Sequence, residues 1–387
     1  MSTSAVPSKS PISAPGVTEL GSIAPLISTK TRVPRLRPDL LLRPRLIDFI
    51  HTHLDRRLIL ISAPAGYGKT SLLTGFAADT DLKVCWYTLD PFDQDLHVFL
   101  EYLVEAIAVR FPDFGHRSRA LLRDLADPSG DLYPIVTTMV REIYDRIEEH
   151  FVLILDDHHT VETQEQINEF LDLFVTYVDE NCHLILASRT LPALPNLSLH
   201  VARRQAAGLS IDELRFTAAE VRALAQQNYG LGLNLEQAEI LAQRTGGWIT
   251  GLLLTAVSQW EQEKADLPDQ GWVNVDLYDY LSRQVLDQQP ADLQGFLMGS
   301  SVLDELSPDL CTTVLGINGS VAFIDQIRQR NLFVLDFGED INHLRYHALF
   351  REFLRSSLQR QDEARFRKLM RRAAEAYANL GEWERAV

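Results

Sequence analysis

A lysine and a threonine stand side by side in a glycine loop that follows an apolar run. The loop reads Ala63-Pro64-Ala65-Gly66-Tyr67-Gly68-Lys69-Thr70-Ser71 and follows the strand-like residues 59–62. Glycines let the backbone bend so that successive N–H groups point inward, where the next helix presents its positive end. Lys69 would reach the β- and γ-phosphates of a nucleotide, and the Thr70 hydroxyl would ligate Mg²⁺. The pattern predicts a phosphate-binding P-loop, with Ala63 in place of its usual first glycine.

Two aspartates end a second apolar run, at residues 151–155. Such a run is typical of a central strand in a parallel sheet that is covered on both faces. An acid at the carboxyl end of that strand lies where open α/β sheets bind ligands. Beside a P-loop, Asp156 would hold Mg²⁺ and Asp157 would orient or deprotonate the attacking water. The plainer alternative is that two aspartates only end a strand and begin a turn.

A third apolar run, residues 183–187, leads to Ser188 and Arg189. A cation at this strand end would sense the γ-phosphate, although pairing with a surface carboxylate stays open as an alternative. Helical intervals separate the three runs. The spacing therefore predicts an α/β P-loop fold with a doubly wound, mostly parallel sheet.

Composition narrows the class of protein. The chain has 387 residues, of which 46% are hydrophobic, so two to four domains with real cores are expected. Its formal net charge of −16 argues against nucleic-acid binding by bulk electrostatics. Two basic runs, at residues 30–45 and 365–372, are expected to be solvated faces or to have intramolecular partners.

The cysteines and the apolar segments indicate the compartment. The chain has three cysteines, Cys85, Cys182 and Cys311, which lie far apart in the sequence and lack the spacing of metal ligands. We therefore expect them to be buried thiols in a reducing compartment. No run of 18 apolar residues exists, so no membrane partner is expected. A cytoplasmic location follows as the expectation.

The chain divides into five stretches. Residues 1–26 are rich in Ser, Pro and Ala and predict a disordered tail, before a P-loop domain at 27–212. A helical lid domain follows at 213–272, where Thr217 and Glu220 form a capping-box pattern. Helices and a β-hairpin at residues 332–346 predict a winged-helix domain at 273–360. Residues 361–387 would begin a TPR-like helical-repeat region, or form a single docked helix.

The ordered set of motifs resembles the N-terminal part of the MalT-like STAND proteins. These are signal-transduction P-loop ATPases carried by large LuxR-family and related bacterial transcriptional regulators. The motifs that carry the resemblance are Arg43-Pro44-Arg45-Leu46, the P-loop, Trp86-Tyr87-Thr88-Leu89-Asp90, Leu155-Asp156-Asp157-His158-His159, Ala187-Ser188-Arg189, Gly246-Gly247-Trp248 and Tyr346-His347-Ala348-Leu349-Phe350. The similarity covers essentially residues 27–387.

The resemblance implies a set of site residues. Lys69, Asp156, Asp157 and Arg189 would serve ATP hydrolysis, and Thr70 and Asp156 would hold Mg²⁺. The segment Val33–Arg45 would border the adenine. The implied nucleotide-binding residues are Pro34, Arg43, Ala65, Gly66, Tyr67, Gly68, Lys69, Thr70, Ser71 and His347. His347 would contact the ADP β-phosphate, or be a packed corner histidine.

Two features fall outside these assignments. Many relatives have a proline where Ile249 follows Trp248, so no base-contacting residue is assigned there. Asp90, Asp93 and Asp95 match the family pattern without an assigned role, and capping of the next helix is the plain option.

The resemblance also implies a mechanism. ATP or ADP with Mg²⁺ would be the cofactor, and the ADP-bound protein would be a closed monomer with slow ATPase activity. An inducer bound by a downstream repeat region would favour ATP and oligomerisation, and DNA would be bound only through a further effector domain. The alternatives are an AAA+-type motor or loader, and a regulator whose own winged helix reads DNA.

Overall fold

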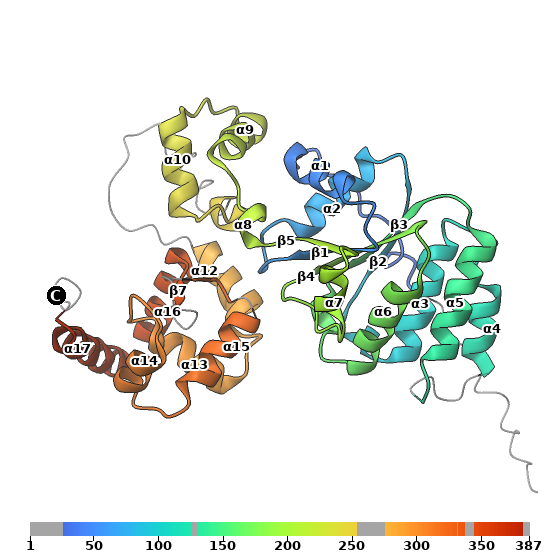
Figure 1. Ribbon diagram of the computed structural model, residues 1–387. Helices are drawn as coiled ribbons and strands as arrows, with labels where there is room; N and C mark the ends of the chain where they lie inside the picture. Colours follow the sequence, from blue (N-terminus) through green and yellow to red (C-terminus); the bar gives the residue numbers. More distant parts are fainter. Residues whose placement is uncertain (1–25, 125–129, 254–274, 331, 337–343, 382–387) are drawn as a thin grey trace, which may run out of the picture.

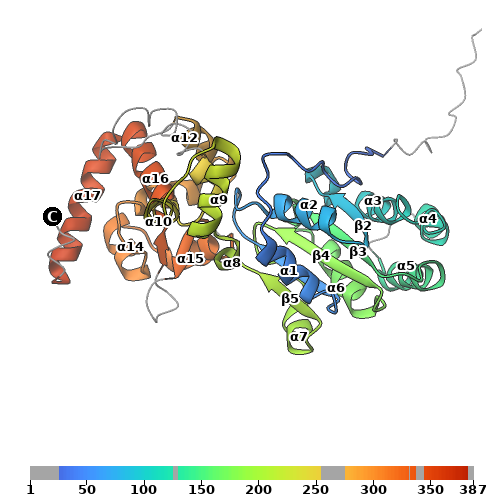
Figure 2. The same ribbon diagram turned by 90° about the horizontal axis from the view of Figure 1, so that it is seen from above.

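The computed structural model describes residues 26–124, 130–253, 275–330, 332–336 and 344–381. Three units follow one another along the chain: a P-loop unit up to residue 209, a helical unit at 211–253 and a winged-helix unit from 275. Figures 1 and 2 show the P-loop unit on one side and the other two together on the opposite side. The short helix α8 (Ile211–Leu214) lies at the waist between them. The predicted tail lies almost wholly outside the described residues.

A five-stranded parallel sheet forms the centre of the P-loop unit. Its strands are β1 (Leu58–Ser62), β2 (Lys83–Thr88), β3 (Phe151–Asp156), β4 (Cys182–Ser188) and β5 (Ala206–Leu209). The order across the sheet is β2-β3-β4-β1-β5, so β4 lies between the P-loop strand and the strand that ends in Asp156. All the carboxyl ends meet at one edge of the sheet. The α/β P-loop fold predicted from the sequence is confirmed.

Successive side chains of each strand point to opposite faces of the sheet, and both faces are apolar. Ile59, Ile61 and Ile154 point into one core, whereas Leu58, Leu60 and Leu153 point into the other. The first core is covered by α1 (Pro44–Thr52) and α2 (Lys69–Asp79). The second is covered by α3 (Leu96–Ala108), α4 (His116–Asp124), α5 (Tyr133–Arg146) and α6 (Glu165–Tyr177), with α7 (Leu197–Ala202) at its margin. Burial on both faces explains why the strands read as continuous apolar runs.

The helical unit contains α9 (Ala218–Tyr229) and α10 (Leu235–Arg244), and the chain is helical again from Ile249 to Leu253. The predicted capping box is present, because Thr217 Oγ1 accepts from the Glu220 N–H and Glu220 Oε2 accepts from the Thr217 N–H. Glu220 also pairs with Arg43 and Arg45. The cap of α9 is therefore tied to the start of α1.

The winged-helix unit consists of helices and a two-stranded antiparallel hairpin. The elements are α12 (Val275–Leu281), the π-helical turn η3 (Ser282–Leu286), α13 (Ala291–Ser300), α14 (Pro308–Leu315), α15 (Ser320–Gln329), β6 (Val334–Asp336), β7 (Leu344–Tyr346) and α16 (Ala348–Gln361). The predicted hairpin is present, but its tip lies outside the described residues. The π turn continues α12, and the Asp287 N–H donates to Ser282 O at 2.8 Å.

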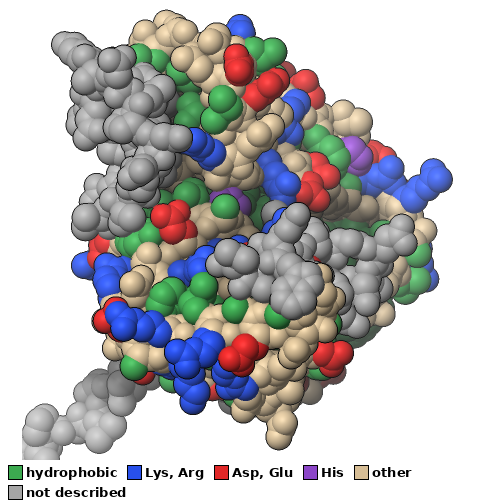
Figure 3. All heavy atoms as spheres, turned by 90° about the vertical axis from the view of Figure 1, so that its left-hand side faces the viewer, with side chains coloured by type: hydrophobic (Ala, Val, Ile, Leu, Met, Phe, Trp, Pro, Cys, Tyr) green, Lys and Arg blue, Asp and Glu red, His purple; other side chains and the backbone are tan. Residues whose placement is uncertain are grey.

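The last described helix, α17 (Glu363–Asn379), packs on α14 and α16. Figure 3 shows one face of the molecule. Lys and Arg side chains gather on the half of that face that the winged-helix unit and α17 form. Arg365 and Arg372 of the basic run donate to the carbonyls of Gly295 and Thr313, and Arg367 pairs with Glu363. The run thus has intramolecular partners. The start of a helical repeat at 361–387 stays a prediction. No helix in the described ranges has the length and apolarity to cross a membrane.

The unassigned aspartates of the sequence hold the edge of the sheet together. Asp90 caps the 3-10 helix η1 (Pro91–Gln94), and Asp95 caps α3 by accepting from the Val98 N–H. Asp93 is fully buried and accepts from Lys30 Nζ at 2.6 and 2.7 Å. Lys30 O in turn accepts from the Thr88 N–H of the edge strand β2. The cluster therefore fastens the N-terminal segment to the sheet.

We expect Asp93→Asn to destabilise the P-loop unit by about 3 kcal/mol, because the buried Lys30 charge then keeps only its ion pair with the more exposed Asp90. The measurement is the midpoint of urea unfolding by tryptophan fluorescence. Glu149→Gln is the matched control, since it breaks the exposed pair with Lys83 and should barely move the midpoint. Equal shifts in the two variants would contradict a special role for Asp93.

Candidate nucleotide-binding site

The P-loop bends at two glycines in the left-handed region. Gly66 and Gly68 both have φ +80°, which glycine adopts without a steric penalty. Ala63 is not among the described residues with positive φ, which explains why alanine can replace the first glycine of the pattern. Gly68 is the N-cap of α2, so the loop leads directly into the positive end of that helix.

Lys69 is buried at the first position of α2. Its Nζ donates to the carbonyls of Ala63 and Pro64, at 2.7 and 3.2 Å. Burial lowers the pKa of Lys69 to about 8, and Asp157 and Asp156 oppose that shift. An anion in the loop would favour the charged lysine, so the geometry suits a phosphate.

The two aspartates take different positions. Asp156 is buried, and its Oδ2 accepts from Thr70 Oγ1 at 2.8 Å. Burial and the neighbouring Asp157 raise the pKa of Asp156 to about 6, so a nearby cation would be favourable. Asp157 is partly exposed and has a left-handed backbone, with φ 61°.

His159 and Arg189 lie beside the acids. His159 Nδ1 is 3.6 Å from Asp157 Oδ1, but burial, Arg189 and Lys69 lower the pKa of His159 to about 3. The histidine is therefore neutral, and the contact is not an ion pair. Arg189 Nη1 donates to the carbonyl of Gln284 in the winged-helix unit, at 3.2 Å. The predicted γ-phosphate sensor thus has a partner in another unit.

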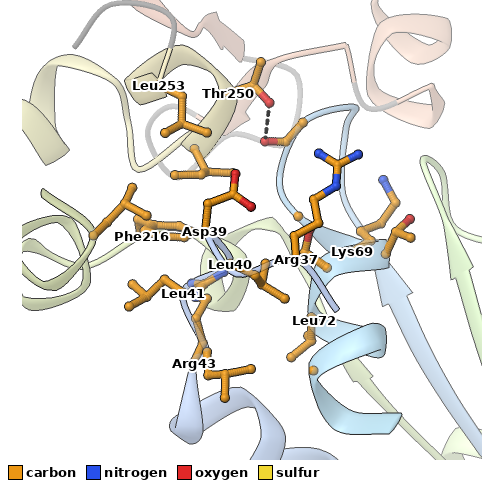
Figure 4. A pocket seen from close by; sticks show the side chains of 18 of the residues that line it. Arg37, Asp39, Leu40, Leu41, Arg43, Lys69, Leu72, Phe216, Thr250 and Leu253 are labelled. Atoms are coloured by element: carbon orange, nitrogen blue, oxygen red, sulfur yellow. Dashed lines mark hydrogen bonds between the residues drawn. The ribbon is translucent and has the colours of Figure 1, made fainter. Parts of the chain in front are cut away.

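A cavity of about 480 Å³ opens between the P-loop and the helical unit. Figure 4 shows Lys69 on the right, Phe216 on the left, and Thr250 and Leu253 at the top. Arg37, Asp39, Leu40 and Leu41 lie between them, with Arg43 below. The predicted residues that line it are Arg43, Ala65, Gly66, Gly68, Lys69, Thr70, Ser71, Asp157 and Arg189. Asp156 lies behind Thr70. The volume is within the usual range for a small-molecule site.

Three predicted or unassigned residues need separate mention. Pro34 lines a different groove, beside Thr74 and Val84. Tyr67 is 1% exposed and its ring lies 6.3 Å from that of Phe333, so it is a core residue. Ile249, to which the sequence assigns no role, lines the cavity. The structure therefore places Ile249, and neither Pro34 nor Tyr67, at the nucleotide cavity.

All three nitrogens of the Arg43 guanidinium donate hydrogen bonds within the protein. It donates to the carbonyls of Leu214 and Arg215 at 2.9 and 2.7 Å, and pairs with Glu220. Its Cζ also stands 4.2 Å from the ring centre of Phe216. Arg43 lines the cavity, but its charge joins the P-loop unit to the helical unit.

The helical unit holds the P-loop by its carbonyls. Trp248 Nε1 donates to Ala65 O at 3.0 Å, and Thr250 donates to Gly66 O through both its N–H and its hydroxyl. A Cβ on Gly66 would lie 2.4 Å from Thr250 Oγ1. The sequence pattern Gly-Gly-Trp was the only signal for this contact, since neither Trp248 nor Thr250 belongs to the P-loop motif.

His347 lies apart from the cavity. Its Nε2 donates to the Thr245 carbonyl at 2.7 Å, and it is 4% exposed. A Cβ on Gly246 would lie 2.3 Å from His347 Nε2, and one on Gly247 would collide with Arg215 and Phe216. In this arrangement His347 is thus a packed corner residue that joins the winged-helix unit to the helical unit. It does not line the cavity, so its assignment to the β-phosphate remains a hypothesis.

The described residues fit an adenine nucleotide with Mg²⁺. The glycine cradle and Lys69 suit phosphates, and residues 40–42 and Phe216 provide apolar wall for a base. The Thr70 hydroxyl and the Asp156 carboxylate, 2.8 Å apart, are oxygen donors of the kind Mg²⁺ prefers. Within the described ranges no group of three His, Cys, Asp or Glu forms an all-protein metal cage.

Known proteins are similar to this chain in sequence or in fold. The chain is 29% identical to the HTH-type transcriptional regulator MalT of Yersinia pestis over 360 residues, and also 29% identical to that of Yersinia enterocolitica over 364. Residues 282–366 match the MalT winged helix domain. The resemblance to MalT-like P-loop proteins is confirmed. The MalT match covers 92% of this chain but 39% of each relative, so the chain spans about two fifths of their length.

A solved structure supports the fold. The Walker-type ATPase of Pyrococcus abyssi superposes with a TM-score of 0.57, over 83% of this chain and 98% of that one. The two sequences are 13% identical, so this likeness concerns the fold alone.

We expect acid to weaken the contact between His347 and the helical unit. Burial lowers the pKa of His347 to about 4, below its ordinary value of 6.5. The unfolded chain takes up a proton below about pH 6.5 and the folded protein only below about pH 4. The contribution is therefore present above pH 6.5 and is lost as the pH falls, by about 3 kcal/mol at pH 4.

His347→Gln removes this titration but keeps a donor for the Thr245 carbonyl. Its melting temperature should fall less steeply between pH 6.5 and 4 than that of the parent, as measured by differential scanning fluorimetry. The difference between the two proteins is the readout, because the buried His158 contributes with the same sign in both. Parallel curves would mean that His347 does not titrate in this range.

Proposed function

We propose that this chain is the nucleotide-binding part of a MalT-like transcriptional regulator, and that it works as a nucleotide-gated switch. ADP would hold the closed arrangement, and ATP would favour an open, oligomerising form. The observation that carries the proposal is the position of the cavity. The P-loop that lines it is hydrogen-bonded to the helical unit, and its sensor Arg189 is hydrogen-bonded to the winged-helix unit.

Residue roles follow from the geometry. Backbone N–H groups of the glycine loop and Lys69 would bind phosphates, and Thr70 and Asp156 would hold Mg²⁺. Mg²⁺ would neutralise charge on the β- and γ-phosphates. Asp157, whose carboxylate is partly exposed at the cavity, would orient the attacking water. Hydrolysis would reset the switch slowly.

The Arg189 contact suggests how the closed form limits hydrolysis. While Arg189 donates to Gln284 O, its guanidinium is engaged by the winged-helix unit. Movement of that unit would free the arginine for a γ-phosphate. A ligand shifts such an equilibrium only by its differential affinity for the two forms. The γ-phosphate would provide that difference.

The rest of the regulator would lie outside this chain. We propose that an inducer acts through a repeat region beyond α17, and that a separate effector domain binds DNA. The relatives are HTH-type transcriptional regulators, and the chain matches about two fifths of their length. A cytoplasmic location belongs to the same proposal.

We expect the purified protein to retain ADP, and Lys69→Ala to lose it. Lys69 would make charge-assisted hydrogen bonds to phosphate, worth about 1.5–3 kcal/mol each, so affinity should fall about a hundredfold. The measurement is chromatography of nucleotide released by denaturation, with calorimetric titration of ADP. Lys83→Ala, an exposed lysine on β2, is the control and should bind like the parent. Absence of ADP binding by the parent would refute the switch.

We expect Asp157→Asn to bind ATP within about threefold of the parent but to hydrolyse it about a hundredfold more slowly, because an amide cannot act as the acid–base group. Asp156→Asn should also weaken Mg²⁺-dependent binding. Single-turnover hydrolysis and fluorescent-nucleotide titration measure the two effects. Asp113→Asn, at an exposed position outside the cavity, serves as the control. Hydrolysis by Asp157→Asn at the parent rate would show that Asp157 is not catalytic.

A further inference from the structure

One arginine of the cavity has no partner for its charge. Arg37 lines the cavity and is exposed, and within the described part of the chain its guanidinium takes part in no ion pair or hydrogen bond. In Figure 4 its side chain extends into the cavity alongside the P-loop, on the side where Lys69 lies. No motif in the sequence singles it out, since it belongs to the irregular stretch before α1.

The other cations of the cavity are already engaged. Lys69 donates to two P-loop carbonyls, and Arg189 donates to the Gln284 carbonyl. Arg43 is held by Glu220 and by the carbonyls of Leu214 and Arg215. Arg37 is thus the lining arginine whose charge remains available to a ligand without the loss of an existing contact.

The segment that carries Arg37 is fixed from two sides. A turn closes where the Leu40 N–H donates to Arg37 O at 3.1 Å. On the helical unit, Asn228 Nδ2 donates to Asp39 O at 2.8 Å and Gln227 Nε2 donates to Leu40 O at 3.2 Å. On the P-loop unit, a Cβ on Gly75 of α2 would lie 3.0 Å from Leu42 Cδ2. The position of Arg37 therefore depends on both α9 and α2.

The charges around the cavity favour a polyanion at this end. Arg37, Lys69 and Arg189 line it from three different segments of the chain, whereas the lining acids are Asp39 and Asp157. A guanidinium forms two parallel hydrogen bonds to phosphate oxygens, which a single ammonium group cannot do. The phosphate chain of a nucleotide placed in the P-loop would start beside Lys69.

We propose that Arg37 binds the phosphates of the nucleotide, and that the position of α9 determines whether it reaches them. The inference rests on the proposed function, since it names a further residue of the same nucleotide site. Arg37 supplies a cation from the segment that α9 holds, so closure of the helical unit over the P-loop completes the phosphate site.

The test compares ADP with adenosine on the full chain. Arg37→Ala should weaken ADP binding by on the order of tenfold to a hundredfold, the effect of one or two charge-assisted hydrogen bonds. Its affinity for adenosine, measured by NMR titration, should change less than about twofold. Arg37→Lys should recover part of the ADP affinity, because it restores the charge without the paired donors. Arg32→Ala, an exposed arginine upstream that does not line the cavity, should bind both ligands like the parent.

Each result decides a separate point. Unchanged ADP affinity in Arg37→Ala would overturn the assignment, and so would an equal loss for ADP and adenosine, which would place Arg37 at the base or ribose. An equal loss of ADP affinity in Arg32→Ala would show that the effect comes from the net charge of the protein, and it would also overturn the assignment. Absence of ADP binding by the parent would instead refute the nucleotide site as a whole. Arg37 is exposed, so melting temperatures of the variants should match the parent and confirm that they fold.

Discussion

The contact between Trp248 and the P-loop holds the three units in one arrangement. Trp248 is fully buried, and its indole N–H donates to the Ala65 carbonyl of the loop. Its ring lies 5.1 Å from Phe333 and 6.2 Å from His347, both in the winged-helix unit. A large aromatic side chain with one polar atom suits this position, because it buries apolar surface and still satisfies its donor.

The helical unit contacts the P-loop through its carbonyl groups, so the N–H groups of the loop would remain for a ligand. Trp248 and Thr250 donate to the carbonyl oxygens of Ala65 and Gly66, so their contacts use none of the N–H groups of the loop. A phosphate would be bound by N–H groups on the inner side. Any change in the loop that accompanies nucleotide exchange would therefore reach the helical unit through hydrogen bonds, and the winged-helix unit through the packed aromatic rings.

Small residues make this packing possible. Gly66 has no room for a Cβ beside Thr250, and Gly246 has none beside His347. Both also have positive φ, so two independent requirements select glycine at each position. The glycines of the Gly-Gly-Trp pattern are explained in the same way, as a close approach between units and a left-handed turn.

Much of the P-loop unit could be predicted from the sequence, because its signals are local. The apolar runs at residues 151–155 and 183–187 form central strands, and the glycine loop between β1 and α2 has the expected bends. The Thr217 capping box and the hairpin strands are likewise contained in short stretches of chain. Each of these depends on backbone preferences and on periodic burial, which a sequence displays directly.

The composition of the cavity depended on tertiary structure. Arg43 and Arg37 are six residues apart and equally basic. Glu220, 177 residues after Arg43, pairs with Arg43, whereas the guanidinium of Arg37 has no partner in the part of the chain that the structure describes. Lys30 and Asp93 form a buried pair across 63 residues of sequence, which explains an acidic cluster that had no assigned role. The sequence by itself determined the elements and the chemistry of the loop. Only the packing of distant segments decided which charged side chains pair between units and which remain available to a ligand.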